Sequence, residues 1–200
     1  MTTNPFAILR QNAQILGWVS QGCPVPPPPA VKRRLLRAFQ RKHNLPVFIE
    51  TGTFKGDTLE DMASHVKRAV SIELAAEFHA RAKKRFASRQ HVEVLHGDSG
   101  QVLPPLVAAL TEPALFWLDG HYSGGDTAHG EDASPISREL DAILASPVPG
   151  HVILIDDVHE FTGAGGYPPI GRLLTTLANE PRFACRIEAN ILILEPRNRA

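Results

Sequence analysis

Two apolar runs in the second half of the chain end in carboxylates. Asp119 follows the run 114–118, and Asp156 and Asp157 follow the run 152–155. If these runs are neighbouring strands of one sheet, the three carboxylates share a cleft, where they repel one another unless a cation or a proton joins them. Oxygen ligands of this kind suit Mg²⁺, Mn²⁺ or Ca²⁺. Acids at strand ends also cap loops and helix starts, so the sequence leaves a metal site and a purely structural role open.

A further acid, Glu50, ends the first apolar run of the expected fold and precedes a glycine-containing turn. Gly52 and Gly56 allow backbone angles that are open to glycine, and a missing Cβ lets a ligand approach the main chain. The Glu50 carboxylate would repel the pyrophosphate of a dinucleotide, but it can face an ammonium or a sulfonium. The position therefore favours S-adenosylmethionine (SAM) over NAD, although an ordinary strand-to-helix turn could have the same spacing.

Two further motifs supply polar groups that suit a nucleoside. Glu73 follows the run 69–72, where a carboxylate can accept both hydrogen bonds of a ribose diol, an arrangement that NAD enzymes also use. Asp98 and Ser99 follow the run 92–95 and could receive the exocyclic amine of adenine or contact its ring. Either residue could instead cap the helix that follows, and the two roles are compatible.

The apolar runs alternate with helical patterns, as a parallel sheet with crossover helices requires. Strands are expected at residues 47–50, 69–72, 92–95, 114–118, 152–155, 185–187 and 191–194. Helices are expected at residues 57–66, 75–87, 100–110, 134–145 and 170–179. Ligands of open α/β sheets bind beyond the carboxyl ends of the strands, so the acids at these ends are expected to face one cleft.

Length and composition fit one α/β domain with an N-terminal extension. The 200 residues can bury a single core without staples, and the net charge of +0 gives no global field that would attract nucleic acid. Cys23 lies in a proline-rich segment and Cys185 in an expected core strand, so we expect no disulfide framework and a reducing, cytoplasmic location. We expect neither a signal peptide nor a membrane span at the start of the chain, because residues 1–5 lack a basic n-region and a long apolar stretch.

Residues 1–45 are organised differently from residues 46–200, which are expected to form the α/β domain. The run Cys-Pro-Val-Pro-Pro-Pro-Pro-Ala at 23–30 favours an extended polyproline spacer between the segments 6–19 and 31–43. The second segment has apolar residues at helical spacing with Lys and Arg between them, which predicts an amphipathic helix packed on the domain. Its basic face is either simply solvated or contacts an anionic partner or membrane surface.

Five segments together resemble a known family. VFIETGTFKG, SIE, HGDSGQVLPPL, FWLDGHY and ILIDDV are similar in order and spacing to motifs of class I SAM-dependent methyltransferases. Within that class they look like the small Mg²⁺-dependent catechol-type and macrolide-sugar O-methyltransferases. The resemblance covers residues 47–195. It implies a Rossmann-like, doubly wound, seven-stranded sheet that is mostly parallel, has a reversed last strand and lies between two helix layers.

The resemblance also implies roles for the polar residues at the strand ends. Glu50 and Gly52 would lie by the methionine portion of the cofactor, and Glu73 would bind its ribose. Residues by adenine would be Asp98 and Ser99. The remaining implied cofactor residues are Thr51, Thr53, Gly56 and Asp119. The implied metal ligands are Asp119, Asp156 and Asp157.

The chain departs from the family at the residue that removes a proton. Catechol-type enzymes carry a lysine shortly after the first metal acid, where this chain has Tyr122 beside His121. His121 is then the expected general base, because an imidazole titrates near neutral pH. His159 is the alternative. Asp119, the first metal acid, is the other expected catalytic residue. The glycine-rich segment 120–132 suits a lid or substrate clamp, although plain surface flexibility would give the same composition.

The substrate is the least defined part of the expectation. Residues that could line its pocket are Tyr122, His129, Phe161 and Tyr167, and the segment 161–169 could form a mobile rim. We expect methyl transfer to an oxygen of a small hydroxylated acceptor such as a sugar, a phenol or a secondary metabolite, with Mg²⁺ as an optional aid. An NAD-dependent oxidoreductase is disfavoured because no GxGxxG turn follows the first strand. A non-catalytic binding or scaffold protein of the same fold stays open, as does a homo-oligomer.

Overall fold

The computed structural model describes residues 5–120, 135–164 and 166–197. The helices are α1 (Pro5–Ser20), α2 (Pro29–His43), α3 (Asp57–Ala63), α4 (Ala76–Arg85), α5 (Ser99–Ala108), α6 (Ile136–Leu144) and α7 (Ile170–Ala178), and the short 3-10 helix is η1 (Val158–Glu160). The strands are β1 (Val47–Thr51), β2 (Arg68–Glu73), β3 (Val92–His96), β4 (Ala114–Leu118), β5 (Val152–Ile155), β6 (Phe183–Glu188) and β7 (Ile191–Pro196). Each predicted strand and helix is present, with ends that differ by a few residues.

The strands form one seven-stranded sheet in the order β3-β2-β1-β4-β5-β7-β6. The pairs β1 with β2, β1 with β4, β2 with β3 and β4 with β5 are parallel. β7 runs antiparallel to both of its neighbours, β5 and β6. The strand order reverses between β1 and β4, which is where α/β sheets of this kind bind ligands. The expected doubly wound, mostly parallel sheet with a reversed last strand is confirmed.

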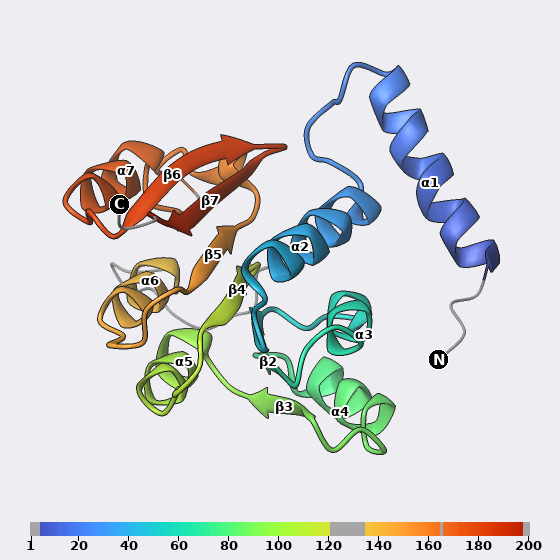
Figure 1. Cartoon of the computed structure of the whole chain (residues 1–200), viewed down its shortest axis with the longest axis horizontal. Coiled ribbons are helices and arrows are strands. Elements are labelled where there is room, and N and C mark those ends of the chain that lie inside the picture. Colours follow the sequence, from blue (N-terminus) through green and yellow to red (C-terminus); the bar gives the residue numbers. More distant parts are fainter. Residues whose placement is uncertain (1–4, 121–134, 165, 198–200) are drawn as a thin grey trace.

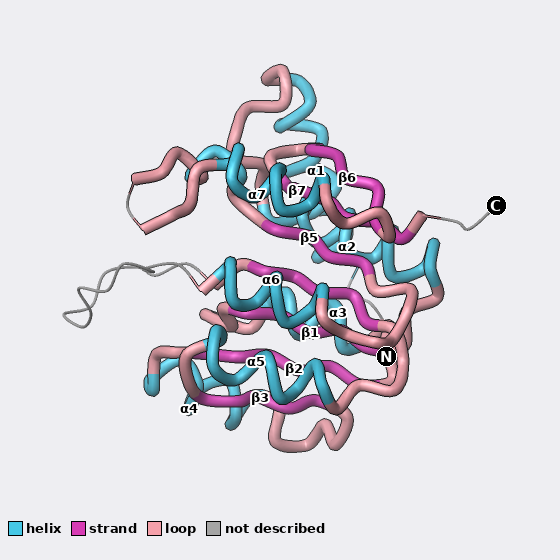
Figure 2. The backbone as a smooth tube through the Cα atoms, turned by 90° about the vertical axis from the view of Figure 1, so that its left-hand side faces the viewer, coloured by secondary structure: helices cyan, strands magenta, loops and turns pink. Residues whose placement is uncertain are grey.

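Helices cover both faces of the sheet because successive strand residues point to opposite sides (Figure 2). Ile49 and Phe116 belong to the core shared with α5, α6 and α7. Phe48 and Trp117 belong to the core shared with α2, α3 and α4. The result is a three-layer α/β/α architecture. We call the side of the sheet that α2, α3 and α4 cover the α2 face.

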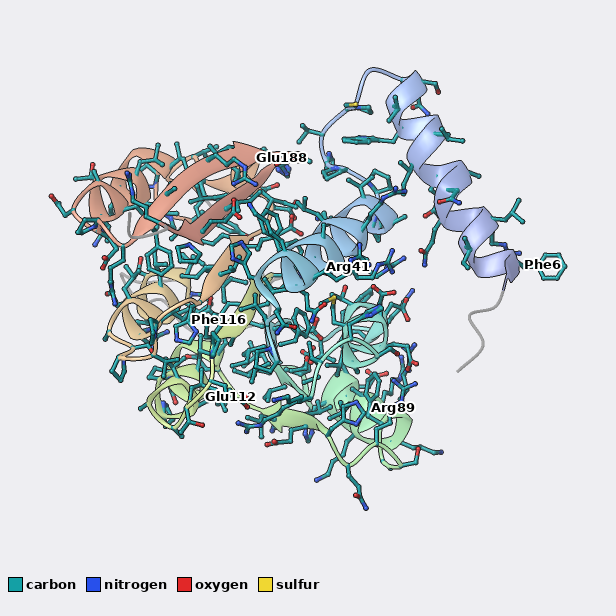
Figure 3. The ribbon with its side chains drawn as sticks, in the orientation of Figure 1. Phe6, Arg41, Arg89, Glu112, Phe116 and Glu188 are labelled. Carbon is teal, nitrogen blue, oxygen red and sulfur yellow. The ribbon has the colours of Figure 1, made fainter. Side chains whose placement is uncertain are left out.

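The two N-terminal helices differ in how they pack. Leu36 and Phe39 of α2 are buried in the core on the α2 face. α1 instead projects away from the sheet, with Phe6 at its far end (Figures 1 and 3), and its Leu9 and Leu16 are each 69% exposed. The division into residues 1–45 and 46–200 stays a prediction. In the part of the chain that the structure describes, no helix combines the length and apolar character needed to cross a membrane.

The structure differs from the sequence-based expectations in two places, the start of α2 and the position of Cys185 in the sheet. The expected spacer extends to residue 30, but α2 already begins at Pro29, because proline is tolerated in the first turn of a helix. The expectation that Cys185 lies in a core strand is wrong, because β6 is the edge strand of the sheet and Cys185 is exposed. Phe183 is the residue of β6 that is buried.

Candidate cofactor and metal site

The carboxyl ends of the central strands are aligned, and their hydrogen bonds continue one residue beyond the strands. Asp119 N donates to Thr51 O at 3.2 Å, and Asp156 N donates to Leu118 O at 3.0 Å. Gly52 N donates to a carbonyl oxygen of β2 at 2.9 Å. These bonds place Gly52, Asp119 and Asp156 in one row, at the point where the strand order reverses.

The alternation of side chains decides which face of the sheet each acid takes. Trp117 and Leu154 are buried on the α2 face. Asp119 and Asp156, each two residues further along the chain, continue on the same face because side chains alternate with a period of two. Glu50 follows the same rule in β1. The three acids therefore gather on the α2 face of the carboxyl edge.

The turn after β1 depends on its two glycines. Gly52 has a φ of +86°, and a Cβ on it would lie 2.5 Å from the carbonyl oxygen of Asp119. Gly56 has a φ of +74°, and its Cβ would lie 3.0 Å from the ring of Phe86. Phe54 between them also has a positive φ. Contacts within the chain thus explain why both positions need glycine, and their predicted contact with a cofactor stays a prediction.

Glu50 is buried and takes part in a network of polar side chains. Its Oε1 accepts a hydrogen bond from Ser71 Oγ at 2.7 Å, and Thr53 Oγ1 lies 2.5 Å from the same hydroxyl. Burial raises the pKa of Glu50 to about 8, against the lowering effect of the Ser71 hydrogen bond. Glu50 is therefore mostly neutral at pH 7 in the protein alone. A cationic ligand placed beside it would favour the ionised form, which is the role that the sequence predicts for it.

Glu73 stabilises the turns that surround it. Its Oε2 accepts a hydrogen bond from Phe54 N and its Oε1 accepts one from Ala75 N, each at 2.8 Å. The carboxylate is buried, yet each of its oxygens has a second lone pair for a further donor. The predicted contact with a ribose diol stays a prediction.

Asp98 is the N-cap of α5, as one of the two alternatives predicts. Its Oδ1 accepts a hydrogen bond from Gly100 N at 2.8 Å, and its Oδ2 lies 3.3 Å from Arg138 of α6. Ser99 is the first residue of α5. Capping is compatible with a contact to adenine, which stays a prediction for both residues.

Glu139 is a site residue that sequence reasoning missed. It lies on α6 with its side chain buried, and the hydroxyls of Ser99 and Thr51 lie near its carboxyl. Burial raises the pKa of Glu139 to about 7, although both hydroxyls act to lower it. A Cβ on Gly120 would lie 3.1 Å from Thr51 Oγ1, so the segment that follows β4 packs against the same hydroxyl. The only signal in the sequence is an acid in the apolar stripe of a predicted helix.

The three predicted metal ligands are brought together. One carboxylate oxygen from each of Asp119, Asp156 and Asp157 lies within 4.8 Å of the others. Asp157 precedes η1 and has a left-handed backbone with a φ of +51°. Burial and the neighbouring Asp119 carboxylate raise the pKa of Asp156 to about 7. We refer to these three residues as the Asp cluster.

Lys32 of α2 also reaches the Asp cluster. Its Nζ donates a hydrogen bond to Asp156 Oδ2 and lies 3.3 Å from Asp157 Oδ1. Burial disfavours the charged ammonium, but the carboxylates of Asp156, Asp157 and Asp119 together outweigh this effect, so the pKa of Lys32 is raised. Nothing in the sequence separates Lys32 from the other basic residues of 31–43. The contact arises because α2 covers the face on which the acids lie.

Asn190 links the Asp cluster to His159, the alternative general base. The β6–β7 turn places Ala189 and Asn190 at positive φ. Asn190 Nδ2 donates to Asp157 Oδ1 at 3.2 Å and lies 2.8 Å from His159 Nδ1. His159 N donates to Asn190 Oδ1 at 3.0 Å. His159 is thus held next to the cluster by Asn190, which sequence reasoning also missed.

Several predicted residues fall outside the described part of the chain. These are His121, Tyr122, His129 and most of the predicted lid 120–132. Phe161 and Tyr167 are described, and their rings pack edge to face with centroids 5.3 Å apart. They line a small cavity together with Glu139 and Asp156. Burial raises the pKa of Tyr167 to about 12, and nearby carboxylates add to this.

The residues present fit a polar ligand and a divalent cation. Three buried carboxylate oxygens at this edge have no hydrogen-bond partner among the described residues, namely Glu50 Oε2, Glu139 Oε1 and Asp156 Oδ1. Buried atoms of this kind are costly unless they find a partner, and a bound ligand can supply one. The Asp cluster offers oxygen atoms alone, which is the donor set of Mg²⁺ or Mn²⁺.

Comparisons with known proteins place the fold. No protein-family model and no curated protein matches the chain. Among solved structures, the O-methyltransferase from Bacillus cereus in complex with S-adenosylhomocysteine (SAH) aligns with a TM-score of 0.64 and 17% identity, covering 92% of this chain and 90% of that one. The O-methyltransferase TomG from Streptomyces achromogenes, involved in tomaymycin synthesis and in complex with SAM, aligns with a TM-score of 0.64 and 21% identity over 94% and 89%.

A third solved structure, cofactor-bound Rv0187 from MTB, aligns with a TM-score of 0.63 and 17% identity, covering 99% of this chain and all (100%) of that one. Identities this low concern the fold and leave activity open. At that level the comparisons confirm the resemblance that the sequence motifs indicate. The chain has the fold of the class I SAM-dependent O-methyltransferases.

Proposed function

We propose that the protein is a SAM-dependent methyltransferase that acts on an oxygen of a small hydroxylated acceptor. The observation that carries the proposal is the gathering of Glu50, Glu73 and the Asp cluster at the carboxyl edge, where the strand order reverses. Solved structures of the same fold include O-methyltransferases with SAM or SAH bound. The acceptor class, a sugar, a phenol or a secondary metabolite, rests on the sequence resemblance.

In this proposal the turn after β1 and the end of β2 bind the cofactor. Glu50 faces its cationic amino acid portion, and Glu73 accepts hydrogen bonds from its ribose. Thr51, Ser99 and Glu139 offer polar groups on the other face of the sheet edge. SAM supplies an electrophilic methyl group, and most of the catalysis is the positioning of acceptor oxygen, methyl and sulfur in line.

The Asp cluster and a histidine act on the acceptor. The cluster would hold a divalent ion such as Mg²⁺, which supplies a positive charge that lowers the pKa of an acceptor hydroxyl. The imidazole of His121 would take the proton of that hydroxyl, with His159 as the alternative base. Asn190 fixes the ring of His159 through its contact with Nδ1.

Calorimetric titration with SAH, with NAD as the control ligand, tests the cofactor. We expect saturable binding of SAH and no binding of NAD, in buffer containing Mg²⁺. Binding of NAD alone would mean an oxidoreductase, and binding of neither would favour a scaffold protein of the same fold. In either case the proposed function fails.

The variant Asp119→Ala tests the metal-assisted step. It removes one oxygen ligand of the Asp cluster, so we expect methyl transfer to a screened acceptor to fall by about a hundredfold or more while SAH affinity stays nearly unchanged. Asp141→Ala, which changes an exposed acid of α6, serves as the matched control. Unchanged turnover in Asp119→Ala, or in enzyme treated with a chelator, would leave a metal-free transferase.

A further inference from the structure

Lys32 differs from other ion-paired lysines of the described chain in where its charge lies. Its side chain is 17% exposed and that of its partner Asp156 is 0% exposed. Lys42 of the same helix pairs with Glu195 at 2.5 Å but is 61% exposed, and Lys67, paired with Glu112, is 75% exposed. Ion pairs at such exposed positions contribute little, whereas a charge held away from water depends on its partners. The charge of Lys32 therefore depends on the carboxylates beside it and not on water.

The position of Lys32 on α2 is unfavourable without the Asp cluster. α2 begins at Pro29 with no acidic residue in its first turn, so Lys32 carries its positive charge near the positive end of the helix dipole. The compensating charges come from Asp156 and Asp157, whose carboxylates the ammonium of Lys32 contacts. The first turn of α2 and the carboxyl edge of the sheet are thus joined through one ammonium.

The ammonium lies against the carboxylates that a divalent ion would use. Lys32 Nζ contacts Asp156 and Asp157, whose oxygens belong to the same group of atoms within 4.8 Å. Asp156 Oδ1 is buried without a partner among the described residues, so the lysine does not satisfy the cluster completely. The ammonium carries one positive charge and offsets the negative charge of one carboxylate. A divalent ion would offset the charges of two and could take all three carboxylates as ligands.

We propose that Lys32 is a built-in cation of the Asp cluster, and that a divalent metal ion binds only by displacing its ammonium. The inference rests on the metal-assisted form of the proposed function for the identity of the site. Lys32 then lowers the affinity of the Asp cluster for the metal, and it offsets the repulsion among the three carboxylates when no metal is bound. Its flexible four-carbon stem allows the ammonium to leave while the apolar side of α2 stays packed. Metal binding thereby becomes coupled to the start of α2.

Direct measurement of Mn²⁺ binding to the full chain tests the proposal. Calorimetry with Mn²⁺ would compare wild type with Lys32→Met, which keeps the length of the side chain and removes its charge. We expect Lys32→Met to bind Mn²⁺ about tenfold more tightly or better, because no internal cation has to be displaced. Lys42→Met is the matched control, since it removes an ion-paired lysine of the same helix away from the cluster, and it should bind like wild type.

A second measurement uses wild-type protein and does not depend on the variant folding. Reductive methylation of lysines, read by mass spectrometry, would be carried out with and without Mn²⁺. Displacement predicts that Mn²⁺ increases the labelling of Lys32 and leaves that of Lys42 unchanged. Equal or weaker Mn²⁺ affinity in a folded Lys32→Met, the absence of Mn²⁺ binding to both proteins, or protection of Lys32 by Mn²⁺ would each overturn the proposal.

The outcome separates this inference from the proposed function. SAH titration of wild type and Lys32→Met reports on the cofactor site, which does not include Lys32. Tighter Mn²⁺ binding by the variant without any SAH binding would support the built-in cation and reject the methyltransferase. SAH binding by both proteins with equal Mn²⁺ affinities would support the methyltransferase and reject the built-in cation.

Discussion

Gly52 is the residue at which the backbone of the candidate site tolerates least change. In Gly52→Ala the new Cβ would lie 2.5 Å from the Asp119 carbonyl oxygen, at a φ of +86° that L side chains rarely adopt. We expect a loss of free energy of unfolding on the order of 3 kcal/mol, measured by urea titration. Gly171→Ala is the control, because nothing lies within 4 Å of its Cβ and alanine favours the helix. If the free energy of unfolding of Gly52→Ala changed as little as that of the control, the tight packing of Gly52 against Asp119 would be contradicted.

At the scale of residues, the sequence predicts the acids well and their partners poorly. Asp119 and Asp156 can be placed on one edge and one face from the strand pattern alone, because side-chain alternation and parallel register are local rules. Lys32, Glu139 and Asn190 could not be assigned to the site in that way. Each reaches it through packing between elements far apart in the chain, which no spacing in the sequence encodes.

At the scale of elements, α6 buries an acid against the end of β1, and this makes stability depend on pH. The pKa of Glu139 is raised to about 7 from an ordinary value of 4.5, so the folded state holds its proton more tightly than the unfolded state. Its stabilising contribution is complete below about pH 4.5 and is lost as the pH rises through about 7. The raised pKa corresponds to a decrease in the free energy of unfolding on the order of 3 kcal/mol as the pH rises from about 4.5 to about 7.

Glu139→Gln removes this titration and tests the argument. Urea unfolding of wild type and variant at about pH 5 and about pH 8 gives the free energy of unfolding in each condition. We expect the decrease between the two pH values to be smaller in the variant by an amount on the order of 3 kcal/mol. Glu77→Gln, at a side chain 71% exposed on α4, should keep the wild-type decrease. The same pH dependence in Glu139→Gln and wild type would refute a buried, neutral Glu139.

The elements themselves follow from local signals, whereas their place in the sheet does not. Apolar runs ending in acids or glycine turns locate β1, β4 and β5, and helical periodicity locates α6 and α7. The reversed β7 was expected only from the resemblance, and the edge position of β6 was not predicted, because strand order depends on contacts between distant segments. Cys185 was misplaced for this reason. An edge strand and a core strand can have similar composition, and only the neighbour on the outer side distinguishes them.

At the scale of the whole molecule, α1 and α2 are expected to differ in their importance for the fold. α1 stands apart from the sheet (Figure 1) and leaves Phe6 76% exposed, whereas Leu36 of α2 is fully buried in a core. Removal of residues 1–22 should therefore leave the free energy of unfolding within about 1 kcal/mol of the full chain, measured by urea titration. Leu36→Ala, the comparison variant, should cost about 2–5 kcal/mol through its cavity. A truncation as costly as Leu36→Ala would place α1 in the folding unit, whereas a silent truncation would put the boundary of the domain between the two helices and not at residue 45.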